Sequence, residues 1–476
     1  MWGFPPAAAL LLASSVALAN GRFPRAERLR EDPRDPDRLV LAATYGILST
    51  EDRGRHWYHI CEASFADLAS YTGDPLLDFI NDGTLFAGVQ ATLNASRDGC
   101  RWKPTLGGGG STFVVDYTVV RAEPATIVAL LANYRNGTVD YALWKSTDGA
   151  ENWSEIGAVP TQTAYTLDVD QADPERVYVT ALTDNVGRLL RSTDGGRTWT
   201  ERPIPNTNIG EPPYIAALHP GDPQRIYVRT DSWVPLDGDL TAYDALLYSS
   251  DGGESWTELF RNRAKLLGFA LSPDGKTVLL GYGDPFQGGA ISVPGPFGIF
   301  KSSTDAFAFE PVFSGHIGCL SWTARGVYIC ASQHFDGFEL GLLPDGDFSA
   351  ASRCIQPLLR LPDVKGPLQC AAGTSGSACT ANWLAACTVF GACTDAGSTG
   401  GKCAGDDAST GVPVDAAPDT PPTIPPPPVG STEGGDCACR THPAPTRRPA
   451  GVIGLFSSAA LLLGRRARRR AHRRTN

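Results

Sequence analysis

Short apolar runs recur along the chain at intervals of about fifty residues, each bounded by Gly, Pro or Asp. They are rich in Val, Ile, Leu and Tyr, and several follow an Asp-Pro pair, as at Asp35-Pro36 and Asp173-Pro174. Such composition between turn residues predicts β-strands. Seven runs share it: Arg38–Leu41, Thr84–Ala87, Thr126–Ala129, Arg176–Val179, Arg225–Val228, Thr277–Leu280 and Gly326–Ile329.

A polar motif, Ser-x-Asp-x-Gly-x-x-Trp, follows six of these runs and is called the Asp box below. Residues 192–199 and 249–256 are complete copies, and 50–57 and 146–153 are near copies. Shortened copies lie at 96–102 and 303–309. The aspartates are 46, 50, 46, 57 and 54 residues apart. A unit of four strands repeated at this spacing predicts a β-propeller, because one such sheet cannot bury its own faces.

These boxes resemble the Asp-box (BNR) repeat of sialidases, sortilin-type receptors and photosystem assembly factors, from about Phe23 to Pro357. We therefore predict an all-β, seven-bladed propeller over residues 20–357, with six or eight blades as alternatives. In an Asp box the Ser and Asp side chains accept backbone N–H bonds within a tight hairpin, and the Trp packs between sheets. The boxes are thus expected to be structural, not catalytic. Their aspartates are Asp52, Asp98, Asp148, Asp194, Asp251 and Asp305.

The two ends of the chain carry targeting patterns. Residues 1–19 are uncharged and apolar and end Ala-Leu-Ala, which predicts a signal peptide. Residues 404–436 are rich in Pro and Gly and predict a disordered linker. Residues 437–476 contain Cys437, Cys439, an apolar stretch and an Arg-rich end. This closely resembles the myxobacterial C-terminal sorting domain, which implies an exported protein anchored at the outer surface through a Cys.

The net charge of the chain is more negative when the Arg-rich tail is excluded. The whole chain has a formal charge of -10, but ten arginines and no acids follow Cys439. Residues 20–439 therefore hold 31 basic and 51 acidic groups, a net charge of −20. An acidic body argues against nucleic-acid binding, which needs a basic face. With 19% charged residues and one Met, a coiled coil is also excluded.

Ten cysteines lie outside the sorting signal, an even number that predicts disulfides in an exported chain. Six of them fall within residues 354–403. We expect residues 358–403 to form a small disulfide-stapled segment, with its connectivity left open. No pair of these cysteines has the spacing of a zinc site, and we expect no metal and no cofactor.

Function must then come from the loops between the second and third strands and between blades, because long loops on a rigid scaffold often bind ligands. Acids beside aromatic residues suit a sugar or a cationic peptide. The candidate ligand-binding residues are Trp233, Asp237, Asp239, Tyr243, Asp284, Phe286, His334 and Asp336.

We expect a monomeric, non-enzymatic module that binds a protein or glycan at the cell surface. The alternative is a sialidase-like or other glycoside hydrolase that uses two loop carboxylates. Sialidases begin their first blade with an Arg-Ile-Pro motif, and the comparable stretch here, residues 21–25, matches it poorly.

Overall fold

The computed structural model describes residues 25–66, 74–89, 91–232, 243–285, 293–349 and 355–393. All of them belong to one compact unit, residues 1–419. The predicted signal peptide (1–19), linker (404–436) and sorting signal (437–476) lie outside the described residues. Among the described helices, none is long and apolar enough to cross a membrane.

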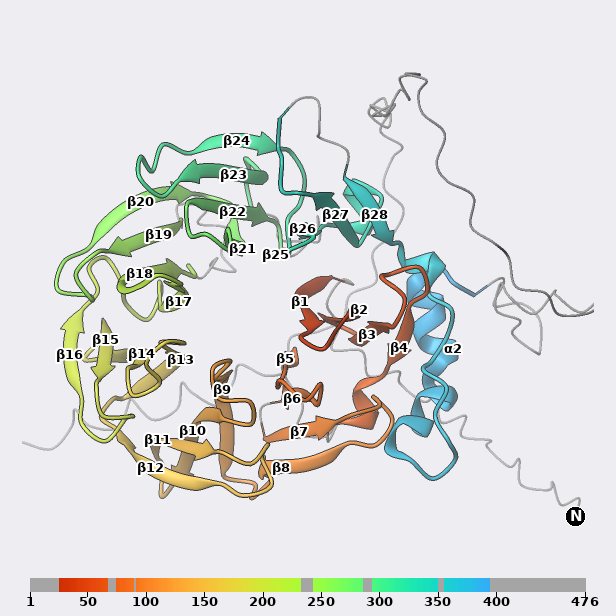
Figure 1. Cartoon of the computed structure of the whole chain (residues 1–476), viewed down its shortest axis with the longest axis horizontal. Coiled ribbons are helices and arrows are strands. Elements are labelled where there is room, and N and C mark those ends of the chain that lie inside the picture. Colours follow the sequence, from red (N-terminus) through yellow and green to blue (C-terminus); the bar gives the residue numbers. More distant parts are fainter. Residues whose placement is uncertain are drawn as a thin grey trace, which may run out of the picture. The chain divides into compact units, whose positions relative to one another are not determined.

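Seven four-stranded antiparallel sheets surround a central axis (Figure 1), which confirms the predicted seven-bladed propeller. Blade 1 contains β1 (Ala26–Asp32), β2 (Asp35–Ala43), β3 (Gly46–Thr50) and β4 (Tyr58–Ile60), and blade 2 contains β5 (Leu76–Phe79), β6 (Leu85–Val89), β7 (Thr92–Ser96) and β8 (Lys103–Gly107). Blade 3 contains β9 (Thr112–Val119), β10 (Ile127–Arg135), β11 (Thr138–Ser146) and β12 (Ser154–Val159), and blade 4 contains β13 (Thr163–Val169), β14 (Val177–Thr183), β15 (Val186–Ser192) and β16 (Thr200–Pro203). Blade 5 contains β17 (Pro213–His219), β18 (Asp222–Thr230), β19 (Asp244–Ser249) and β20 (Thr257–Asn262), and blade 6 contains β21 (Lys265–Leu271), β22 (Thr277–Gly283), β23 (Gly298–Ser303) and β24 (Glu310–Phe313). Blade 7 contains β25 (Cys319–Thr323), β26 (Gly326–Cys330), β27 (Leu340–Pro344) and β28 (Gln356–Leu359).

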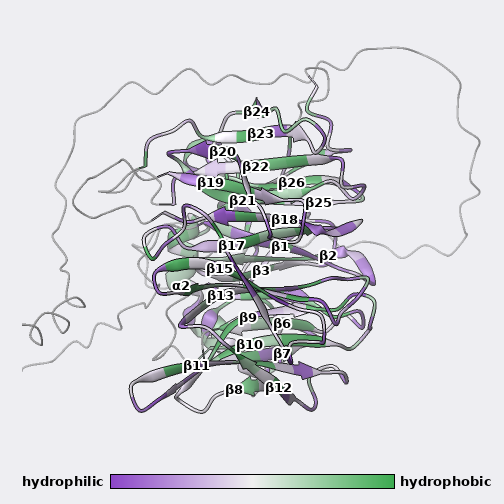
Figure 2. Ribbon diagram, turned by 90° about the vertical axis from the view of Figure 1, so that its left-hand side faces the viewer, coloured by the Kyte–Doolittle hydropathy of each residue, from purple (hydrophilic) through white to green (hydrophobic). Residues whose placement is uncertain are grey.

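The seven apolar runs found in the sequence all lie in the second strand of a blade. These strands have neighbours in their own sheet on both edges and a packed blade on both faces, so nearly every side chain is buried. The described residues contain seven clusters of buried apolar side chains, one at each junction between neighbouring blades. The hydrophobic core of the ring is therefore divided among the blade junctions. Viewed from the side, hydrophobic segments lie within the strands and hydrophilic segments at many strand ends (Figure 2).

The two faces of the ring differ in the loops that they carry. The Asp-box face holds the turns between the first and second strands of each blade and, between the third and fourth strands, the boxes themselves. The open face holds the loops between the second and third strands and the connections between blades. This division follows from the antiparallel order of each sheet, because consecutive turns alternate between its two ends.

Residues 361–393 follow the last blade and return to the beginning of the ring. They contain η2 (Leu361–Asp363), η3 (Ser375–Ser377) and the helix α2 (Ala378–Phe390). Two disulfides, Cys61–Cys379 and Cys100–Cys370, join this segment to blades 1 and 2. Cys387–Cys393 closes the end of α2, and Cys319–Cys330 lies within blade 7. The disulfide-rich segment expected after the propeller is therefore confirmed, and its bridges, whose connectivity the sequence left open, mostly join it to the propeller.

Candidate functional site

The side chains of the complete Asp boxes bond to their own turns. In blade 4, Asp194 Oδ1 accepts hydrogen bonds from Ser192 Oγ (2.7 Å) and from the amides of Arg197 (3.0 Å) and Thr198 (2.8 Å). Asp194 Oδ2 accepts from Thr198 Oγ1 at 2.6 Å, and Ser192 Oγ accepts from the Gly196 amide at 2.8 Å. These bonds, that of Thr198 above all, hold the pKa of Asp194 well below its usual range.

The other boxes repeat this arrangement to different degrees. Bonds from Ser255 lower the pKa of Asp251 to about 2, and bonds from Asn152 do the same for Asp148. Asp52 accepts from the amide of His56, and Asp98 from the amide of Arg101. Between described residues, Asp305 makes no such carboxylate bond. Each intact box therefore uses its aspartate to hold a hairpin.

The open face, by contrast, leaves large apolar side chains in solvent. Five exposed large hydrophobic residues occur on the described propeller, and each lies at an open-face loop or at the strand end beside one. They are Phe113, Tyr134, Val186, Ile209 and Phe335. Ile209 is 70% exposed and Tyr134 is 53% exposed. Exposed apolar residues gathered on one side of a protein mark an interaction surface better than single scattered ones.

Three open-face loops of blades 6 and 7 build an aromatic platform, defined as Phe297, His316 and Phe335. The His316 ring stacks on Phe335 with centroids 4.3 Å apart, and the Phe297 ring centroid lies 4.5 Å from that of His316. Phe335 belongs to the short helix α1 (Gln333–Asp336), which ends at Gly337 in a left-handed conformation (φ 81°). It is 45% exposed and lies beside the exposed His334 ring, 4.7 Å away.

Asp336 links two of the loops that carry this platform. Its Oδ2 accepts hydrogen bonds from the His316 amide and the Ser332 amide, both at 3.0 Å, and lies 3.8 Å from His316 Nδ1. Burial raises the pKa of Asp336. Both hydrogen bonds end on Oδ2, so Oδ1 remains as an acceptor among the described residues. The sequence-predicted His334 and Asp336 are thus brought together, with an aromatic surface between them.

The remaining sequence-predicted residues lie elsewhere. Tyr243 accepts a hydrogen bond from Arg263 Nε at 3.2 Å and lies under the guanidinium groups of Arg261 and Arg263. Asp284, at the end of β22, is only 3% exposed, so it does not form part of an open surface. Trp233, Asp237, Asp239 and Phe286 lie outside the described residues.

A buried ion network that the sequence analysis missed lies at the open-face end of blades 5 and 6. Lys265 Nζ contacts Asp244 Oδ1 at 2.9 Å and Asp231 Oδ1 at 2.5 Å. Asp244 also accepts from the amides of Ser232 and Leu266, both at 2.8 Å. Arg229 Nη1 lies 4.0 Å from Asp231, so Lys265 and Arg229 together compensate the two acids. The bonds of Lys265 join both ends of the β18–β19 loop to blade 6.

Two pockets open among the open-face loops of the described residues. The first, of about 640 Å³, lies between blades 4 and 5 and is lined by Val186, Ile204, Asn206, Glu211 and Arg261 among others. The second, of about 550 Å³, lies at blade 2 and includes Phe65, Thr92, Trp102 and Phe113. Neither was expected from sequence, because their walls come from loops of different blades.

The first strands of the blades, which lie nearest the ring axis (Figure 1), carry acidic residues. Asp116 of β9 accepts from the Leu167 amide of the next blade at 2.9 Å, and Asp168 of β13 accepts from the Val169 amide at 2.8 Å. Burial raises the pKa of Asp116 to about 6 and that of Asp168 to about 7. Nearer the open face, the rings of Tyr165 and Tyr214 lie 5.3 Å apart.

Comparisons with known proteins agree with this architecture. Residues 141–280 match the family described as Sortilin-Vps10 (sortilin, neurotensin receptor 3). A xyloglucanase of Paenibacillus sp is 26% identical over 214 residues, covering 37% of this chain and 20% of that protein. The structure of an ancestral GH74 enzyme has a TM-score of 0.50 at 16% identity, covering 69% of this chain and 46% of that one. A GH74 xyloglucanase from Xanthomonas campestris has a TM-score of 0.33 at 15% identity, covering 64% and 61%. The chain spans about a fifth of the length of the curated relative. The family match and the ancestral GH74 structure agree with a β-propeller of the Asp-box type.

Proposed function

We propose that this chain is an exported, non-enzymatic module that binds a glycan on its open face. The observation that carries the proposal is the gathering of all five exposed large hydrophobic residues of the described propeller on that face. A face built only to join strands would have no need of exposed rings. The opposite face, built from the same strands, shows how polar such turns can be.

A glycan suits the platform better than an apolar ligand does. Aromatic rings offer a flat face for the C–H side of a sugar, while Asp336 and His334 at its edge offer hydrogen-bonding partners for hydroxyl groups. The Paenibacillus relative is named a xyloglucanase, which supports a β-glucan polysaccharide as the first ligand class to test.

The environments of four open-face carboxylates, Asp231, Asp244, Asp284 and Asp336, favour binding over hydrolysis. Glycoside hydrolysis needs two carboxyl groups that face each other across the scissile bond. Here Asp231 and Asp244 are both paired with Lys265, and Asp284 is buried. The titratable neighbour of Asp336 among the described residues is His316.

Export and surface display belong to the same proposal. The predicted signal peptide and the sorting pattern at residues 437–476 both support it. Four disulfides in the described chain also suit an oxidising compartment outside the cytoplasm.

The test is binding of the mature full chain to xyloglucan and to a panel of other polysaccharides, by affinity electrophoresis and calorimetry. Phe335→Ala should weaken binding at least about tenfold, a loss near 1.4 kcal/mol. Leu384→Ala removes a 60% exposed apolar side chain of α2, outside the open-face loops, and is the matched control.

Two outcomes would overturn the proposal. Release of reducing ends from any bound polysaccharide would favour the hydrolase alternative. No binding to any glycan, combined with capture of a defined protein ligand that Phe335→Ala abolishes, would replace the glycan with a protein.

A further inference from the structure

One junction of the ring differs from the other six. Neighbouring blades are joined through the chain everywhere except between blade 7 and blade 1, which hold the last and first strands of the propeller. Each of these two sheets is built from four consecutive strands, so no strand is shared across the junction. Its direct contacts include the Trp57 Nε1 bond to the Leu358 carbonyl (3.0 Å) and the Arg325–Asp37 ion pair (2.7 Å).

The segment after blade 7 crosses this junction. The amide of Lys365 donates to the Trp57 carbonyl at 2.9 Å, and the His59 amide donates to the Gly366 carbonyl at 2.8 Å. The Leu368 amide then donates to the His59 carbonyl at 2.8 Å. This short stretch therefore runs beside β4 and extends the sheet of blade 1 at its outer edge.

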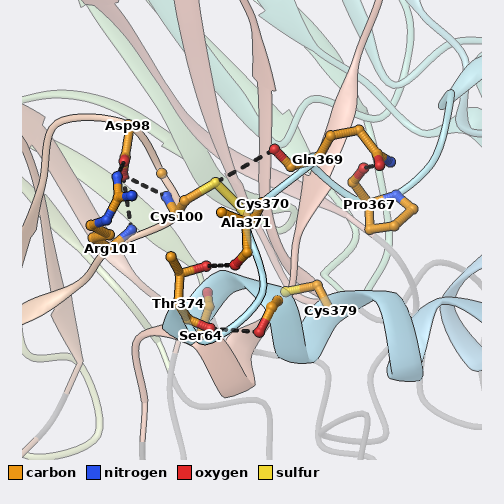
Figure 3. Close-up of a disulfide and its surroundings, with 12 residues drawn as sticks. Ser64, Asp98, Cys100, Arg101, Pro367, Gln369, Cys370, Ala371, Thr374 and Cys379 are labelled. Atoms are coloured by element: carbon orange, nitrogen blue, oxygen red, sulfur yellow. Dashed lines mark hydrogen bonds and ion pairs between the residues drawn. A yellow bond between two sulfur atoms is a disulfide. The ribbon is translucent and has the colours of Figure 1, made fainter.

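Two disulfides then fix the segment beyond the junction. Cys370 bonds to Cys100, which lies within the shortened Asp box of blade 2 (Figure 3), and Cys379 bonds to Cys61 just after β4. The two cysteines of the first bridge are 270 positions apart in the sequence, and those of the second are 318 positions apart. The Gly376 amide adds a bond to the Cys100 carbonyl at 2.8 Å.

Helix α2 completes the attachment by packing on blades 1 and 7. Trp383 and Phe390 join the cluster of buried side chains at the junction of those blades, and the Phe390 ring lies 4.8 Å from Tyr45. The segment thus contacts blade 7, from which it emerges, and blades 1 and 2, to which it is bonded.

We propose that residues 361–393 are a disulfide-fastened clasp that closes the propeller ring. With both bridges formed, blade 7 is held against blade 1 by a covalent path across the one junction that the chain itself does not join. With both reduced, the junction depends on noncovalent contacts alone. This goes beyond the proposed glycan binding and does not depend on it.

Formation of the clasp requires a disulfide donor, such as an oxidised dithiol oxidoreductase met after export. For each bridge, two cysteine thiols lose two protons and two electrons, and one S–S bond forms. The donor disulfide accepts the two protons and the two electrons and becomes a dithiol. The clasp would therefore close last, because its cysteines at 370 and 379 follow the whole propeller in the chain.

The two bridges differ in access, which sharpens the test. Cys61 and Cys379 are 6% and 2% exposed, whereas Cys370 is half-buried at the surface. Graded reduction of the native full chain should open Cys100–Cys370 before Cys61–Cys379. Trapping free thiols by alkylation and locating them by mass spectrometry reads out this order.

The decisive comparison pairs two sets of substitutions in the full chain. The clasp set is C100S/C370S combined with C61S/C379S. The control is C387S/C393S, which removes a bridge of only 6 residues separation at the end of α2. We expect the clasp set to lower the unfolding midpoint by about 10 °C or more and the control by much less.

Limited proteolysis of the reduced wild-type protein keeps the proposal testable even if the clasp set does not fold. After mild reduction and alkylation, cleavage within residues 361–393 should become rapid, with the blades still intact. An unchanged unfolding midpoint after full reduction would overturn the proposal. So would an equal effect of the control pair and the clasp set.

Discussion

The loops at the two ends of the strands, on the two faces of the ring, carry different kinds of side chain. On the Asp-box face, carboxylate and hydroxyl groups bond within their own turns, as Asp194 and Ser192 do. On the open face, rings such as Phe335 and Tyr134 remain in solvent, and charged groups such as Lys265 hold loops to the scaffold. The difference shows which loops the repeat constrains and which it leaves free to vary.

The repeat constrains the Asp-box face because each box must satisfy the same backbone groups of a tight turn. No equivalent demand acts on the open-face loops, which need only connect strands already held in register. Loop length and composition can therefore change there from blade to blade, and binding chemistry can accumulate without loss of the fold.

The largest expected effect falls on an Asp-box Trp. Trp57 is 2% exposed, and its Nε1 donates to the Gly54 and Leu358 carbonyls. Trp57→Ala should lower the free energy of unfolding by about 3–5 kcal/mol, because it leaves a cavity between blades 1 and 7. Urea denaturation of the full chain measures this. A loss below about 1 kcal/mol would show that the boxes are not what holds neighbouring blades together.

The fold was predictable because its signals are local and repeated. Each second strand is buried on both sides, so it reads as an apolar run, and each box is a polar motif within eight residues. The path of residues 361–393 was not predictable, because pairing Cys61 with Cys379 depends on which ends of the ring meet in space. Cysteine spacing alone cannot supply that information.

A second prediction contrasts an aspartate whose pKa is raised by burial with an aspartate whose pKa is lowered by hydrogen bonds. Asp168 of β13 has a pKa raised to about 7 by burial, with the nearby charge of Asp116 adding to it. The Asp168 carboxyl therefore binds its proton more tightly in the folded state than in the unfolded chain. Its contribution to stability is fully present below about pH 4 and is lost as the pH rises through about 7.

Asp168→Asn should remove the loss of folding stability that accompanies ionisation of Asp168 as the pH rises. We expect a gain of about 2 kcal/mol at pH 8 and little change near pH 4, measured as urea midpoints across that range. The box acid Asp251, with its pKa lowered to about 2, has the opposite sign and contributes no such slope above pH 5. An equal gain at both pH values would show that packing, and not ionisation, sets the effect.

A third prediction concerns the hydroxyl of the box. Ser192 Oγ is buried, donates to Asp194 and accepts from the Gly196 amide. Ser192→Ala should cost about 1–2 kcal/mol, because it leaves that amide without its partner. Ser303 in the degenerate box of blade 6 is exposed, and Ser303→Ala is the matched control, with little effect expected. Similar losses at both sites would remove the distinction between complete and degenerate boxes.

The candidate site was only partly predictable. His334, Phe335 and Asp336 stand together in the sequence, so a loop rich in aromatic and acidic groups was recognisable. Phe297 and His316 come from two other loops, and only the fold brings their rings against Phe335. Asp284 looked like a loop carboxylate but is buried at the end of β22. Sequence pattern gives residue types, whereas accessibility depends on packing between blades.

The smallest expected effect on stability comes from the open face, and it tests the comparison most directly. Phe335→Ala removes an aromatic ring, as Trp57→Ala does, but the ring is 45% exposed. Its free energy of unfolding should change by less than about 0.5 kcal/mol while glycan binding is lost. A loss of stability close to that of Trp57→Ala would mean that the platform is packing, and the open face would then have no surplus surface to offer a ligand. Stability that holds while binding fails is the result that separates a surface kept for recognition from one kept for the fold.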